Sequence, residues 1–242
     1  MENDLKGVVR SVNVGQVREL ELRGKPHKTG IFKEPVSGRV RLSGNSVEGD
    51  IQADRRFHGG PYKAVYSYTL EDYAWWEQEL GRPLPPATFG ENLTIEGISA
   101  VDALIGERWA VGSAVLAVTQ PREPCWKLAA KMGEPRFVRR FKDAGRAGAY
   151  LAIVQEGDVG AGDTVEVVSR PSHPISVGMI AFLNNTDREL SRLLMALIPE
   201  EPTPEEWGKV LGALNLPPKY PWSDGEPYPN IPTGDSGEGE DE

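Results

Sequence analysis

The single cysteine of this 242-residue chain, Cys125, occupies a position that favours reactivity. It follows a hydrophobic stretch and a proline-rich turn, and it opens a predicted helix with the sequence CWKLAAKM. The positive end of a helix dipole and the neighbouring Arg122 and Lys127 favour the thiolate, which is the form that binds metals or attacks electrophiles. The alternative is a small buried hydrophobic side chain, which is what most cysteines outside disulfides are.

A second group of reactive side chains lies in the polar segment 49–60, which reads GDIQADRRFHGG. This short segment holds Asp50, Gln52, Asp54, Arg55, Arg56 and His58. Its closing glycines permit backbone conformations that bring amide groups close to a ligand. Two interpretations are open, a binding site and a polar surface loop. A zinc site is not expected, because no second His or Cys stands at metal-ligand spacing from His58.

Two shorter segments, KTG at 28–30 and FGEN at 89–92, also carry polar groups that form turns. Asn92 is predicted either to bind the backbone of a tight turn, its usual role in loops, or to place its amide into a pocket. His27 and His173 border loops and are predicted to be solvated. The chain has no glycine-rich dinucleotide motif, Walker A loop or GxSxG elbow, which argues against the enzyme classes that use them.

The composition is typical of a globular protein, with 39% hydrophobic and 26% charged residues. Seven acidic residues in the last twenty positions supply most of the net charge of −9, so the rest is nearly neutral. This argues against a nucleic-acid partner, which requires clustered Lys and Arg. No stretch approaches the roughly 18–20 consecutive apolar residues of a membrane span, and no secretory signal opens the chain. The lone cysteine excludes an internal disulfide, and we expect a cytoplasmic protein.

The first 170 residues are predicted to be mainly β. Short strands with frequent Gly and Pro breaks favour a barrel or a sandwich over a βαβ array. The predicted strands are Gly7–Val14, Val36–Val47, Ala64–Tyr68, Ala114–Thr119, Ala149–Val154 and Thr164–Val168. The helices predicted between them are Leu70–Leu80, Cys125–Met132 and Arg136–Asp143.

The pattern changes after Arg170. The segment 171–174 is predicted to be a linker because its two prolines disfavour regular structure. A helical period then follows over Asp187–Ile198, with one face formed by Leu190, Leu193, Leu194 and Leu197. A capping box at Thr203–Glu206 predicts a further helix over Trp207–Leu214. The acidic, Pro- and Gly-rich residues 223–242 bury too little apolar surface to become ordered.

Four motifs in series resemble the MOSC-domain family, which is named for the C-terminal domain of molybdenum cofactor sulfurases. The likeness is to its stand-alone, YiiM-like bacterial members, and it covers residues 5 to 170 in the same order. It rests on KTGI at 28–31, GDIQADRRFHGG at 49–60, FGENL at 89–93 and QPREPCWKL at 120–128. Residues 175 to 215 resemble the small three-helix appendage that those proteins carry.

This resemblance implies a mainly β fold, a distorted MOSC-type β-barrel with a few helices and a small C-terminal three-helix appendage. The expected organisation is a barrel domain over 1–170, the helical appendage over 175–217 and a disordered acidic tail over 223–242. The resemblance also implies the molybdenum cofactor, a pyranopterin with a dithiolene and a phosphate. Cys125 matches the family cysteine and would be the thiolate ligand of the molybdenum, a role that suits soft sulfur.

The activity that the resemblance implies is reduction of N-hydroxylated compounds, such as hydroxylamines and hydroxylamino purine analogues. The N–OH oxygen is removed in a two-electron step, and an external electron donor of the flavoprotein type regenerates the metal. The implied contacts to the pterin phosphate and ring are Lys28, Thr29, Arg55, Arg56 and Arg122. Those implied near the metal or the substrate protons are Gln52, Asp54, His58 and Asn92, and a protonated His58 would help hydroxide leave as water.

Two other functions stay open. Cys125 could carry sulfur as a persulfide, as in a transferase related to cofactor sulfuration, or the protein could bind or store the cofactor without turnover. The extra N-terminal substrate domain of the larger eukaryotic relatives is not expected, so the helical appendage or a second subunit of a homodimer would close the substrate pocket.

Overall fold

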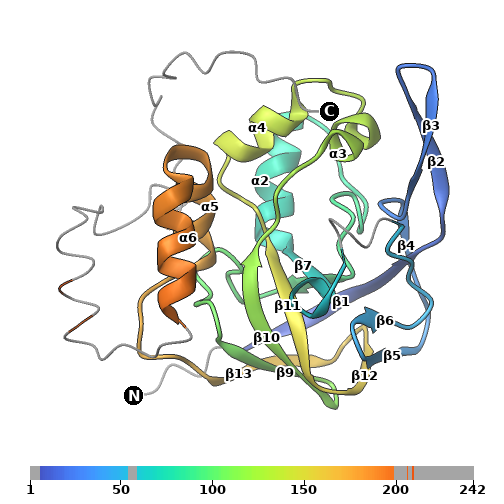
Figure 1. Cartoon of the computed structure of the whole chain (residues 1–242). Helices are drawn as coiled ribbons and strands as arrows, with labels where there is room; N and C mark the ends of the chain where they lie inside the picture. Colours follow the sequence, from blue (N-terminus) through green and yellow to red (C-terminus); the bar gives the residue numbers. More distant parts are fainter. Residues whose placement is uncertain (1–5, 54–58, 199–205, 207–208, 210–242) are drawn as a thin grey trace.

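Seven strands close into a barrel in the computed structural model, which describes residues 6–53, 59–198, 206 and 209 (Figure 1). The barrel closes because β1 pairs with β13 on one side and with β8 on the other. This confirms the mainly β, barrel-type prediction. The strands, in their order around the barrel, are β1 (Lys6–Gly15), β13 (Thr164–Ser169), β9 (Arg108–Val111), β10 (Ala114–Pro121), β11 (Ala149–Gln155), β7 (Val65–Thr69) and β8 (Leu93–Glu96).

The barrel is distorted. The pair β7–β8 is parallel, whereas the other barrel pairs are antiparallel. The register shifts between Val9 and Ser11 in β1 and at two places between β10 and β11. Such bulges bend a strand and redirect its side chains, and they are common beside functional sites. The far end of β1 also pairs with β4 (Lys33–Pro35), which brings Lys33 to the barrel rim.

Smaller β elements extend from the barrel. The stretch Val36–Val47, predicted as a strand with glycine breaks, forms β5 (Arg39–Ser43) and β6 (Ser46–Val47), which a turn at Gly44 separates. These two strands form a sheet with β12 (Gly157–Gly160). The hairpin of β2 (Arg18–Leu22) and β3 (Lys25–Thr29) stands apart from the barrel, in blue in Figure 1.

Short helices cover one end of the barrel. These are α2 (Leu70–Leu80), α3 (Trp126–Met132) and α4 (Phe137–Asp143), whereas the short 3-10 helix η1 (Pro61–Lys63) precedes β7 and lies against β10 and β11. Thr69 caps α2, with its hydroxyl accepting a hydrogen bond from the backbone N–H of Asp72 at 3.1 Å. The helices and β7 enclose an aromatic core in which Trp76, Phe137 and Phe141 are fully buried, whereas Trp75 is partly exposed.

Two helices, α5 (Val177–Thr186) and α6 (Arg188–Leu197), pack on the opposite side of the barrel from the β2–β3 hairpin (Figure 1). Their apolar faces join the barrel core, since Leu183 and Leu194 are buried in the same cluster as the strands. The predicted leucine face is confirmed for Leu194, but Leu193 lies at its edge and is 53% exposed. The third helix, predicted over 207–214, falls almost entirely outside the described residues.

The segment 171–174 has no regular structure, as predicted, yet it is packed rather than loose. The prediction that His173 is solvated is wrong: the side chain is buried, and its Nδ1 accepts a hydrogen bond from the backbone of Ile175 at 3.1 Å. Burial lowers the pKa of His173, so the imidazole is neutral at physiological pH. Among the helices that the structure describes, none has the length and apolar character needed to cross a bilayer.

Candidate functional site

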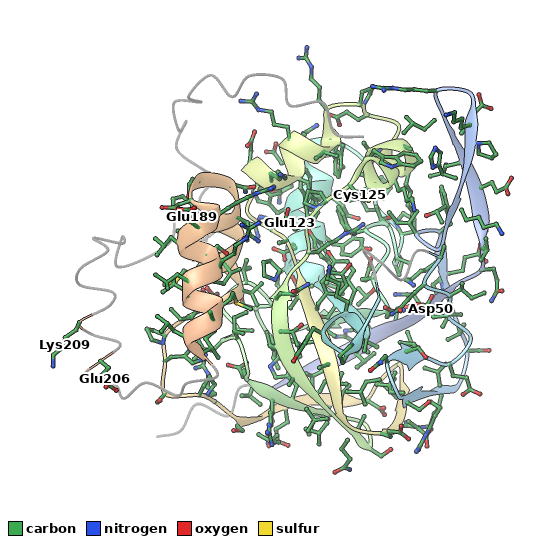
Figure 2. All side chains as sticks on the ribbon, in the orientation of Figure 1. Asp50, Glu123, Cys125, Glu189, Glu206 and Lys209 are labelled. Atoms are coloured by element: carbon green, nitrogen blue, oxygen red, sulfur yellow. The ribbon has the colours of Figure 1, made fainter. Side chains whose placement is uncertain are left out.

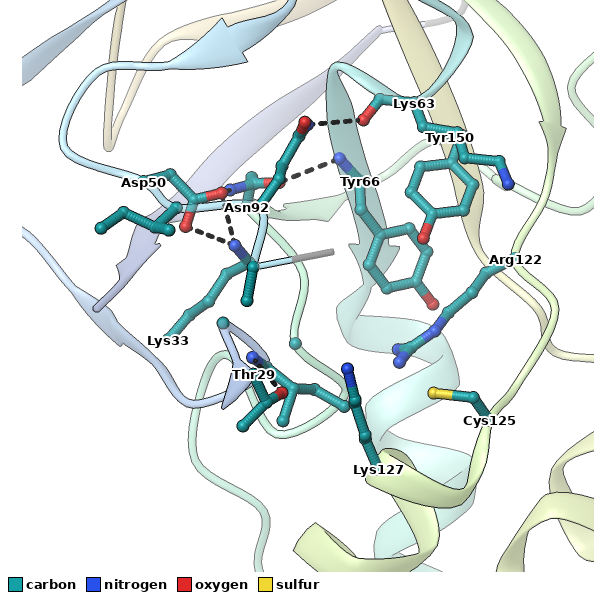
Figure 3. Close-up of a pocket in the computed structure, with 16 residues that line it drawn as sticks. Thr29, Lys33, Asp50, Lys63, Tyr66, Asn92, Arg122, Cys125, Lys127 and Tyr150 are labelled. Atoms are coloured by element: carbon teal, nitrogen blue, oxygen red, sulfur yellow. Dashed lines mark hydrogen bonds and ion pairs between the residues drawn. The ribbon is translucent and has the colours of Figure 1, made fainter. Parts of the chain in front are cut away.

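A cleft beside the barrel rim gathers residues from segments that are far apart in the sequence (Figure 3). All four polar motifs contribute to it. They are the turn after β3, the loop after β6, the FGEN turn before β8 and the stretch from the end of β10 to the start of α3. In Figure 2, Cys125 lies beside the helices and Asp50 beside the small sheet, so the two residues come from different parts of the fold. The cleft encloses about 590 Å³, including space that opens to solvent.

Cys125 reaches the cleft because it is the N-cap residue of α3. Its backbone is extended, and its carbonyl accepts a hydrogen bond from the N–H of Leu128 at 2.9 Å, which starts the helix. This confirms the predicted position at a helix start. The side chain is partly buried, and Figure 3 shows its sulfur in the cleft wall beside Arg122 and Lys127.

Arg122 is held as a buried cation in the same wall and is only 7% exposed. Its guanidinium donates to the carbonyl of Phe89 and lies 5.0 Å from the ring centroid of Tyr66, a cation–π contact. Burial disfavours the charged form, but the two neighbouring tyrosines and Cys125 raise the pKa of this side chain above its ordinary value. A fixed positive charge therefore lies next to the thiol.

The opposite wall is built on a buried ion pair between Asp50 and Lys33. Asp50 also accepts from the backbone N–H of Gly15 at 2.8 Å and from the amide of Asn92 at 2.9 Å. Burial lowers the pKa of Lys33, although its attraction to Asp50 opposes the shift. Each carboxylate oxygen is thus satisfied, and the acid is locked in one orientation at the cleft surface.

The FGEN turn has both of the roles that the sequence left open. The Asn92 amide bonds to the backbone, accepting from Tyr66 N–H at 3.1 Å and donating to Asn13 C=O at 3.2 Å, and it also lines the cleft. The preceding Glu91 is fully buried and holds the turn in place, because it accepts hydrogen bonds from Tyr73, Ala87 and Thr94. The turn is therefore a rigid part of the cleft.

The other predicted contacts fall in different places. Thr29 and Gln52 line the cleft, and the Gln52 amide donates to the carbonyl of Lys63 at 3.1 Å. Lys28 is exposed on β3, and its carbonyl accepts a hydrogen bond from Lys127 at 3.0 Å. Its side chain is not among those that line the cleft. Asp54, Arg55, Arg56 and His58 lie outside the described residues.

The structure adds cleft residues that the sequence analysis did not select. Tyr66 and Tyr150 lie on adjacent strands as Cα partners, Lys33 is the first residue of β4, and Lys63 is the last residue of η1. Tyr66 and Tyr150 belong to stretches that the sequence predicts only as strands. Whether their side chains face the cleft depends on how the barrel closes. The KTGIFK run could have pointed to Lys33, because a lysine beside a polar motif is a recognisable signal.

Positive charge dominates the cleft. Among its described lining residues, one acid, Asp50, faces four cations: Lys33, Lys63, Arg122 and Lys127. Because one acid stands against four cations, the net charge of these described lining residues is positive, which favours an anionic ligand. A cysteine thiol beside them adds a soft donor, which oxygen- and nitrogen-rich sites lack.

The comparisons with known proteins agree with this architecture. The model of the MOSC domain family matches residues 54–166. The uncharacterized protein YflK of Bacillus subtilis is 40% identical over 199 residues, which cover 82% of this chain and 90% of that relative. A protein from Gibberella moniliformis named as a reductase is 33% identical over 170 residues, which cover 68% of this chain and 30% of that longer protein.

The chain belongs to the MOSC-domain family. Within that family it is similar to the YiiM proteins. The crystal structure of YiiM from Geobacillus stearothermophilus superposes with a TM-score of 0.64 at 27% sequence identity, covering 86% of this chain and 98% of that one. The family and subgroup predicted from the four motifs are thereby confirmed.

Proposed function

We propose that this protein is a molybdenum-cofactor-dependent reductase of N-hydroxylated compounds, with Cys125 as the protein ligand of the metal. The observation that carries the proposal is the placement of the Cys125 thiol in a cationic cleft, between Arg122 and Lys127 (Figure 3). Membership of a family of the molybdenum cofactor sulfurase type and a relative named as a reductase support it.

The donor set of the cleft fits the cofactor. A cysteine thiolate is a soft ligand of the kind that suits molybdenum. Arg122, Lys127 and Lys63 are placed to hold an anionic phosphate, to which arginine presents a fixed fork of donors.

The remaining assignments follow from the same placement. Thr29, Gln52 and Asn92 would give the pterin polar contacts along the cleft wall, with Asn92 fixed by its backbone bonds. For Lys28, Asp54, Arg55, Arg56 and His58, roles toward the phosphate or the substrate remain predictions from the family resemblance.

The proposed reaction converts R–NHOH, two electrons and two protons into R–NH2 and water. When bound, the cofactor would supply a metal centre that accepts and passes on the two electrons, which come from an external reduced flavoprotein. The chain itself binds the substrate beside Cys125, and Arg122 keeps a positive charge where negative charge collects on the oxygen that leaves.

The test is turnover by the molybdenum-loaded protein with a chemically reduced viologen as electron donor. We expect 6-hydroxylaminopurine to be converted to adenine, followed by chromatography, and we expect Cys125→Ser to abolish this conversion. A loaded wild-type protein that yields no adenine and no other amine from simple hydroxylamines would contradict the proposal. Sulfane sulfur trapped on Cys125 would instead favour a persulfide carrier.

A further inference from the structure

Tyr150 presents a fixed aromatic ring to the cleft. It lies in β11, which pairs with β7 on one side and β10 on the other, so its backbone is held from both directions. Its carbonyl also accepts a hydrogen bond from the hydroxyl of Thr119 at 2.9 Å. The ring packs on Tyr66 with centroids 5.2 Å apart, and the ammonium of Lys63 lies 5.9 Å from its centroid.

The hydroxyl of Tyr150 differs from those of the buried tyrosines around it. Tyr66 donates to the carbonyl of Ala147 at 2.9 Å, Tyr68 to that of Arg146 at 2.8 Å, and Tyr73 to a carboxylate oxygen of Glu91 at 2.5 Å. In the part of the chain that the structure describes, the Tyr150 hydroxyl makes no such bond, and the residue lines the cleft. Tyr150 is only partly buried, and its hydroxyl is therefore available to whatever occupies the cleft.

The direction of that hydrogen bond follows from the chemistry of the side chain. A tyrosine hydroxyl has an ordinary pKa of about 10, so it carries its proton at neutral pH and can donate. Figure 3 shows Tyr150, Tyr66, Arg122 and Cys125 along one wall. A ligand group that reacts beside the thiol therefore meets a neutral donor and a cation together, and both favour an oxygen acceptor.

We propose that the Tyr150 hydroxyl donates a hydrogen bond to the substrate oxygen that is removed, and that it thereby distinguishes N-hydroxylated substrates from their parent amines. This inference rests on the proposed function. A site that hydrogen-bonds one substrate group discriminates against the analogue that lacks it, because the donor then has no acceptor on the ligand. Adenine, which carries N–H where 6-hydroxylaminopurine carries N–OH, offers no oxygen to this donor.

The test compares binding to the oxidised, molybdenum-loaded protein without an electron donor, so that nothing turns over. Calorimetry gives the dissociation constants of 6-hydroxylaminopurine and adenine for wild type and Tyr150→Phe. The variant is expected to bind 6-hydroxylaminopurine about three- to tenfold more weakly, the loss expected for one hydrogen bond. Its affinity for adenine stays the same. The matched control is Tyr62→Phe, the same change at a side chain that is 68% exposed, which alters neither affinity.

A stability measurement separates recognition from a structural role. Tyr150→Phe keeps the ring that packs on Tyr66 and loses no hydrogen bond to the described residues, so its unfolding temperature should match wild type. A lower unfolding temperature, or an unchanged affinity for 6-hydroxylaminopurine in a protein that reduces it, would overturn the role of Tyr150 and leave the proposed function intact. Absence of reduction by the loaded wild type would overturn both.

Discussion

At the scale of single residues, the charge balance of the cleft depends on Asp50. This carboxylate neutralises the buried Lys33 and accepts two further hydrogen bonds, from Gly15 and Asn92. The side chains of the ion pair are only 4% and 9% exposed, so water screens neither charge. A buried charge that loses its partner is much more costly than an exposed one.

Asp50→Asn should therefore destabilise the fold by about 3 kcal/mol, because Lys33 is left as an uncompensated buried cation. The matched control is Glu34→Gln, which breaks the ion pair between Arg18 and a carboxylate that is 72% exposed. That change should cost less than about 1 kcal/mol. Urea denaturation measures both, and equal costs for the two variants would show that the Asp50 pair is not buried in solution.

Lys131 provides a pH-dependent test of the same region. Its ammonium donates to the carbonyls of Ile31 and Ala87, and burial lowers its pKa to about 8. The unfolded chain, with a lysine pKa of 10.5, binds more protons than the folded one between these values. The stability of wild type relative to Lys131→Met should therefore rise as the pH increases from about 8 to 10.5.

Urea denaturation of wild type and Lys131→Met at pH values below, within and above this window gives the difference in unfolding free energy. The contributions of the titratable groups that both proteins share cancel in that difference. A difference that stays flat through the window would mean that Lys131 titrates as an ordinary exposed lysine.

At the scale of elements, the FGEN turn joins the two walls of the cleft. Gly90 has a φ of +77°, and a Cβ there would lie 2.7 Å from Cγ1 of Ile31. Gly44 has a similar φ of +56°, but no atom lies within 4 Å of its Cβ position. An alanine at position 44 therefore tests backbone strain alone, whereas an alanine at position 90 tests backbone strain together with steric overlap.

Gly44→Ala should cost about 1 kcal/mol, from the left-handed backbone alone. Gly90→Ala should cost roughly 1–3 kcal/mol more, because the turn or the buried Ile31 must also shift. Thermal and urea denaturation of both variants check this. If the two alanines cost the same, the turn is not packed tightly against Ile31.

The parts of the site that could be predicted from the sequence are those that a local sequence pattern specifies. Cys125 begins a helix because a proline-rich turn precedes an apolar helical period, and both signals are local. Tyr150 and Lys33 could not be placed in this way. Tyr150 joins the cleft through the pairing of β11 with β7 and β10, and Lys33 meets Asp50 only when β4 pairs with β1. His173 was predicted to be solvated because flanking prolines suggest a linker, whereas tertiary packing buries it.

At the scale of the whole molecule, one hydrophobic core extends from the barrel into the two C-terminal helices. Leu194 of α6 is fully buried in the cluster that contains barrel residues such as Leu116, while Leu193 on the same helix is 53% exposed. Elements that share a core unfold together, so α5 and α6 should melt with the barrel in one transition.

Leu194→Ala should cost about 2–5 kcal/mol, as for other buried leucines, whereas Leu193→Ala should stay within about 0.5 kcal/mol of wild type. Calorimetry of both variants should show a single transition, shifted only for Leu194→Ala. An early, separate transition in Leu194→Ala would indicate that the helices form an independent unit.

The fold places the Cys125 thiol beside the cations Arg122 and Lys127. The proposed function requires that this thiol bind molybdenum. The most direct test is molybdenum content by elemental mass spectrometry, on wild type and Cys125→Ser purified side by side from a host that makes the cofactor. We predict close to one molybdenum per wild-type chain and its loss in the variant. Equal molybdenum in both proteins, or none in either, would contradict the assignment.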